Sequence, residues 1–111
     1  MEKTVCNAIN SDQCLEFEYE GHRRVLKPFI LYRSQEGVLL IEGAQVIGES
    51  DSESRPFWRS FHLDEISSME ETDGPNSVQS GKILPDVEDK YNPENDRYAE
   101  IVCARNADRY K

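Results

Sequence analysis

Residues 15 to 20 show the clearest alternation of hydrophobic and polar positions in the chain. Leu15, Phe17 and Tyr19 are apolar or aromatic, and the positions between and after them are glutamates. A period of two predicts a β-strand with one buried face and one face in solvent. Gly21 follows this segment and favours a turn into the next element.

The next hydrophobic segment, residues 23–33, predicts a second strand. Pro28 lies inside it and has no amide N–H to donate to a sheet. We therefore expect the strand to lie at an edge or to be bulged at that point. The polar segment 34–37 ends in glycine and suits a hairpin connection.

A third strand is predicted over residues 38–47, because residues 38–42 form a near-continuous apolar run. Gly43 is expected to interrupt or bend it. A fourth strand is predicted over residues 57–66, with pairing running on to Glu70. Close strands with short connections favour a small closed antiparallel barrel over a parallel sheet with helical crossovers.

The two ends of the chain carry weaker patterns. Residues 4–11 predict a short helix with Thr4 as its cap, because apolar residues recur at helical spacing. Residues 48–56 and 73–81 are polar and read as a loop and a linker. The apolar cluster at residues 98–104 predicts either a last strand or a short helix.

The composition is strongly acidic, with 22 acidic residues against 13 basic ones and a formal net charge of -9 among 111 residues. That length suits one domain with a modest core. Most of the surface is expected to repel nucleic acid, so a polyanion needs a local basic patch. The apolar runs are too short to span a membrane, and no membrane partner is expected.

The three cysteines, Cys6, Cys14 and Cys103, are too few and too scattered to indicate a disulfide framework. The N-terminus lacks the apolar core of a secretory signal. Together these features predict a cytoplasmic protein with reduced thiols. Cys6 and Cys14 are interpreted as small apolar fillers of the core.

The middle of the chain resembles the WYL domain family. Residues 15–19 are similar to the opening strand, residues 24–28 place an Arg four positions before a Pro, and residues 32–33 precede a hairpin. Residues 37–43 fall where the Trp-Tyr-Leu triplet of the family lies. Residues 59–66, Arg-Ser-Phe-His-Leu-Asp-Glu-Ile, are similar to the closing motif, Arg-x-Phe-Arg-Leu-Asp-Arg-Ile.

This resemblance covers about half of the chain and implies a mainly β fold, a small Sm/SH3-like antiparallel barrel of about five strands. The expected organisation is an N-terminal helix in residues 1–14, a WYL-like barrel in 15–73, and a linker with a polar extension in 74–111. Such domains occur mostly in bacterial transcription regulation. Only about 14 residues precede the barrel, so a free-standing domain is expected.

Basic residues gather on the second strand and around the fourth in this otherwise acidic chain. If those strands approach each other, their arginines form one cationic pocket, and arginine binds phosphate through a planar fork. An aromatic side chain beside it, Tyr32 or Trp58, is suited to stack a base. The candidate ligand-binding residues are Arg24, Tyr32, Arg33, Arg59 and His62.

Each of these features also has a structural explanation. The arginines can pair with the abundant carboxylates, and Trp58, the only tryptophan, can pack in or beside the core. His22 and His62 have no cysteine at ligand spacing, so no metal site is expected. No catalytic motif is present, and neither an enzyme nor a cofactor is expected.

The leading hypothesis is a regulatory or sensor domain that binds a nucleotide or a short single-stranded nucleic acid. The alternative is a protein–protein module that forms a homo-oligomer or docks a partner through its strand edges. Val38 and Leu39 replace the Trp and Tyr of the family triplet. This change favours the alternative, since it removes part of the ligand site that the family implies.

Overall fold

A computed structural model describes residues 1–48, 57–73, 92 and 94–105 of the chain. In these residues one helix accompanies a six-stranded antiparallel sheet, so the mainly β prediction is confirmed. The elements in order are α1 (Glu2–Ser11), β1 (Cys14–Tyr19), β2 (His22–Arg33), β3 (Leu39–Gly48), β4 (Phe57–His62), the 3-10 turn η1 (Leu63–Glu65), β5 (Ile66–Thr72) and β6 (Glu100–Ala104).

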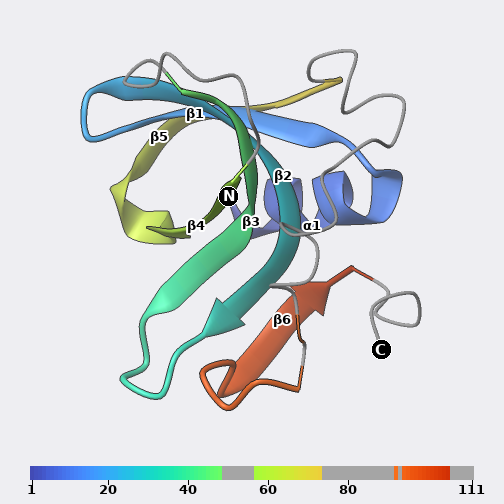
Figure 1. Cartoon of the computed structure of the whole chain (residues 1–111), viewed down its shortest axis with the longest axis vertical. Coiled ribbons are helices and arrows are strands. Elements are labelled where there is room, and N and C mark those ends of the chain that lie inside the picture. The colour runs from blue at the N-terminus through green and yellow to red at the C-terminus, as the bar shows by residue number, and fades with distance from the viewer. Residues whose placement is uncertain (49–56, 74–91, 93, 106–111) are drawn as a thin grey trace.

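The strands follow the order β4-β3-β2-β1-β5, and β6 pairs with β2 beside this path. Figure 1 shows the sheet curling so that β4 and β5 come together on one side, where η1 connects them. No pairing joins β4 to β5 within the described residues. The sheet is therefore not closed, and the predicted barrel is not confirmed.

Strand β2 is the centre of the sheet. One of its edges pairs with β3, while the other pairs with β1 through residues 22–26 and with β6 through residues 30–33. Pro28 lies between these two partners, and the register against β3 shifts between Pro28 and Ile30. The predicted bulge is therefore present, in a central strand rather than at an edge.

Gly43 on β3 faces Pro28 across this bulge. A Cβ atom on Gly43 would lie 2.1 Å from the carbonyl oxygen of Lys27. Only glycine lets the two backbones approach this closely. The predicted irregularity at Gly43 is confirmed, although β3 continues through it without a break.

Two boundaries differ from the prediction. The expected strand over residues 57–66 is broken by η1, where the buried Leu63 turns the chain from β4 into β5. The helix begins at Glu2, so Thr4 lies inside it and makes no cap hydrogen bond. Its ten residues are too few to cross a membrane, and no other helix among the described residues is long and apolar enough to do so.

The core has two clusters, which alternation along β2 and β3 places on opposite faces of these strands. The first cluster contains the apolar side of α1, as predicted, together with side chains from β1 to β5 such as Phe17, Leu26 and Phe61. The second contains Phe29, Ile30, Tyr32, Ala44 and Tyr98. Residues 74–91, 93 and most of the predicted 48–56 loop lie outside the described residues.

The cysteines behave differently from the prediction of reduced thiols. Cys6 on α1 forms a disulfide with Cys103 on β6, and the Cα atoms are 5.8 Å apart. Pairing of β6 with β2 sets Cys103 opposite Leu31, a residue of the first cluster, which α1 also covers. A bridge between residues 97 positions apart leaves no local spacing signal in the sequence. Cys14 is a buried free thiol, as expected.

Candidate functional site

Two of the candidate arginines converge on one aromatic ring. The guanidinium carbon of Arg24, on β2, lies 5.9 Å from the ring centroid of Phe61, and that of Arg59, on β4, lies 5.2 Å from it. Arg59 and Phe61 are two positions apart on one strand, so both side chains lie on its inner face. With Gln45 of β3 they form the interior basic cluster: Arg24, Gln45, Arg59 and Phe61.

Arg24 is the buried arginine of this cluster, with 4% of its surface exposed. Its Nη1 donates a long hydrogen bond of 3.4 Å to Oε1 of Gln45. Its Nε has no acceptor, and neither does Nε2 of Gln45, which is equally buried. No carboxylate pairs with Arg24 anywhere in the described residues.

Other basic residues do pair with carboxylates, which agrees with the alternative that the basic side chains form ion pairs within the fold. Arg23 contacts Glu16 across β1 and β2, and Lys27 lies 3.5 Å from Asp12. Asp12 is exposed and Glu16 is half-buried, so solvent partly screens both pairs and they stabilise the fold little. A buried guanidinium without a carboxylate is unfavourable, so the environment of Arg24 is suited to an anion from outside the fold.

Arg33 lies at the other end of β2, nine positions and up to about 30 Å of strand away from Arg24. Its Nη1 donates to the carbonyl oxygen of Gly37 at 3.1 Å, and its Nε lies 3.6 Å from Glu100. It also borders a hollow of about 490 Å³ whose other walls are mainly apolar. The structure therefore does not bring Arg33 into the interior basic cluster.

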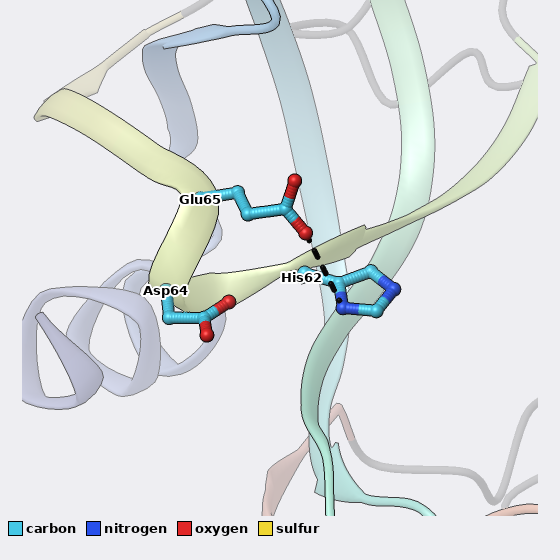
Figure 2. Close-up of side chains that lie close together, drawn as sticks. All are labelled: His62, Asp64 and Glu65. Atoms are coloured by element: carbon cyan, nitrogen blue, oxygen red, sulfur yellow. Dashed lines mark ion pairs between the residues drawn. The ribbon is translucent and has the colours of Figure 1, made fainter.

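His62 points away from the cluster, because it follows Phe61 on β4 and so takes the opposite face. Figure 2 shows its imidazole beside Glu65, with Nδ1 and Oε2 3.5 Å apart, and Asp64 nearby. One ligand atom from each of these three exposed residues lies within 4.8 Å of the others. Exposed groups of this kind are common without an ion, and we assign no metal role to them.

Tyr32 lies on the second cluster, in a network centred on the buried carboxylate of Glu42. The Tyr32 hydroxyl donates to Oε2 at 2.5 Å, and the Tyr98 hydroxyl and Trp58 Nε1 donate to Oε1 at 2.8 and 3.0 Å. Arg97 adds a two-pronged contact through Nε and Nη2 at 3.1 and 3.0 Å. The position of Trp58 agrees with a residue that packs beside the core rather than with one that stacks on a base.

The Glu42 network changes the acidity of its members. Desolvation raises the pKa of Glu42, but hydrogen bonds from Arg97, Tyr32 and Tyr98 outweigh it, so this pKa lies below its usual range. Desolvation and the adjacent carboxylate raise the pKa of both tyrosines. Glu42 is therefore ionised at neutral pH, with every donor around it satisfied, which indicates a structural role.

Two important residues were missed at the sequence level. Glu42 ends an otherwise apolar run but lies inside β3, and an acidic residue within a buried strand is a signal that could have identified it. Gln45 follows Gly43 and Ala44 without any local feature. Its importance depends on Arg24, which lies 21 positions away in the sequence.

Comparisons with known proteins leave the chain without assigned relatives. No family model matches the sequence, and neither the curated proteins nor the solved structures contain a significant match.

Proposed function

We propose that this chain is a WYL-like regulatory or sensor domain with an Sm-like barrel, which binds a nucleotide or a short single-stranded nucleic acid and does not act as an enzyme. The strand order β4-β3-β2-β1-β5 supports the barrel, since η1 brings its two outer strands together. The resemblance of residues 15–66 to the WYL motifs supports the family.

The observation that carries the binding proposal is the burial of Arg24 without a carboxylate. Most other basic side chains of the described residues have an acidic partner, although the chain has a large acidic excess. Arg24 instead lies with Arg59 at the Phe61 ring. A phosphate accepts hydrogen bonds from guanidinium groups, and it would supply the charge that the fold does not.

A thermal-shift screen at low salt tests this proposal, using mononucleotides and short single-stranded oligonucleotides. A ligand present at about 100 times its dissociation constant adds about 2.7 kcal/mol to the free energy of unfolding. For a domain of this size that corresponds to a rise in Tm of roughly 10 °C. If no nucleotide or oligonucleotide raises Tm, the binding proposal is wrong.

Three variants locate the site. Arg24→Met removes a buried charge, so we expect Tm without ligand to stay the same or rise while the ligand-induced shift disappears. Arg59→Gln should weaken binding by removing the second guanidinium. Arg33→Gln is the matched control, because Arg33 is exposed and lies at the far end of β2. A shift lost equally in all three variants would contradict this location.

The protein–protein alternative is favoured by one separate observation on β6. Ile101 and Val102 are 44% and 39% exposed on this short strand, which pairs with β2 alone among the described strands. An apolar strand edge is suited to pair with a second copy. Light scattering over a range of concentrations tests this, and a monomer at high concentration would exclude the oligomer.

A further inference from the structure

Two buried hydrogen-bond donors of the interior basic cluster have no acceptor. They are Nε of Arg24 and Nε2 of Gln45, whose residues are 4% and 1% exposed. Buried polar groups in folded proteins nearly always have a partner, and an unpaired one is costly. Two such donors on residues that are hydrogen-bonded to each other therefore indicate that an acceptor is missing at this position.

The orientation of these donors is fixed by the fold. Oε1 of Gln45 accepts from Nη1 of Arg24, so the amide nitrogen of Gln45 must point away from that contact. If the Gln45 amide were flipped, its NH2 group would face Nη1 of Arg24, and both groups are donors. The guanidinium is held in turn by the ring of Phe61. A group with several acceptor oxygens is therefore needed to reach both the guanidinium N–H and the amide N–H.

The burial of the pair limits the shape of the acceptor. Arg59 is only half-buried and marks the more open side of the cluster, whereas Arg24 and Gln45 are closed off from solvent. A terminal phosphate carries one ester substituent, which can extend toward solvent on the open side of the cluster. A phosphodiester within a nucleic-acid strand has two, and the second would have to pass through the buried end.

We infer that the interior basic cluster receives a terminal phosphate monoester, and hence that the ligand class is a mononucleotide or another 5′-phosphorylated end. This inference rests on the proposed function and makes it more specific. Charge favours the same group, because a monoester carries about -1.5 to -2 at pH 7 and a diester only about -1. The monoester therefore interacts more strongly with the guanidinium groups of Arg24 and Arg59.

Two dinucleotides that differ in one group test the inference on the full chain. The dinucleotide ApA has a single internal diester, whereas pApA carries an added 5′-phosphate. We expect pApA and AMP to raise Tm, and ApA to bind at least tenfold more weakly. Equal shifts with ApA and pApA would overturn the inference and leave the proposed function standing. If none of the three ligands shifts Tm, the proposed function fails as well.

Substitutions at Gln45 test the donor pair itself. Gln45→Glu places a carboxylate next to Arg24, where it acts as an internal substitute for the phosphate. We expect a higher Tm without ligand, by about 4–8 °C, and loss of the shift with AMP. Gln45→Met has a similar length and no charge, and we expect at least tenfold weaker AMP binding with no rise in Tm. An AMP shift that survives in Gln45→Glu would overturn the inference.

Discussion

The Glu42 network allows a quantitative prediction about stability. In the Glu42→Gln variant an amide replaces a carboxylate that accepts hydrogen bonds from Tyr32, Trp58, Arg97 and Tyr98. A tyrosine hydroxyl can turn and accept a bond from the new NH2 group. The tryptophan and arginine donors cannot, because they have no acceptor. At least one donor of Arg97 therefore faces the new NH2 group or loses a charged acceptor.

The expected loss in the free energy of unfolding is about 2–3 kcal/mol, because charge-assisted hydrogen bonds to a buried carboxylate are lost while the Arg97 side chain, 41% exposed, stays partly solvated. A domain of this kind has a total of about 5–15 kcal/mol, so the variant should lose a substantial part of its stability. Tyr98→Phe removes one hydroxyl, which donates to Glu42 and accepts from Arg97, and it leaves the ion pair intact. We expect it to lose only about 1–1.5 kcal/mol.

Urea denaturation followed by tryptophan fluorescence measures these differences, since Trp58 is the only tryptophan and contacts Glu42 directly. Far-UV circular dichroism checks that each variant is folded before urea is added. Glu36→Gln is the matched control, because this exposed glutamate on the hairpin should change stability by less than about 0.5 kcal/mol. The reasoning is refuted if Glu42→Gln loses less than Tyr98→Phe does.

The same structure leads to three further predictions. The depressed pKa of Glu42 stabilises the fold above the unfolded-state pKa of about 4.5, and this contribution is lost as pH falls through the lower folded-state pKa. The stability gap between wild type and Glu42→Gln should therefore shrink in urea titrations below pH 4.5, and a constant gap would contradict the assignment. Thiol titration of the unreduced, denatured protein should detect one thiol, Cys14, rather than three. Reduction of the Cys6–Cys103 bridge should lower the free energy of unfolding by about 2–5 kcal/mol, and three thiols before reduction would show that the bridge is absent.

The strands could be predicted because their signals are local. The alternation at Leu15, Phe17 and Tyr19 lies within six residues, and a single buried face explains it. Pro28 and Gly43 each restrict the backbone at their own position, so the irregularity in the β2–β3 pairing was also visible. The closure of the sheet could not be predicted from local signals, because it depends on whether β4 and β5 pair with each other.

The candidate site was only partly predictable, because the bulge at Pro28 exchanges the two faces of β2. Arg24 and Leu26 face the first core cluster, but after the bulge Leu31 takes that face and Tyr32 turns to the other. Counting alternate residues through the bulge would put Tyr32 on the same face of β2 as Arg24. The network around Tyr32 then depends on Arg97, which no local pattern connects to it.

The distance in sequence between Glu42 and Arg97 has a consequence for synthesis of the protein. Arg97 is made 55 residues after Glu42, when strands β1 to β5 have already been translated. Until then the carboxylate lacks its cationic partner, and a chain terminated between Thr72 and Arg97 would keep strands β1 to β5 but not the charge that stabilises them. We therefore expect a chain that stops before Arg97 to be less stable, and more open to proteolysis, than a chain that includes it.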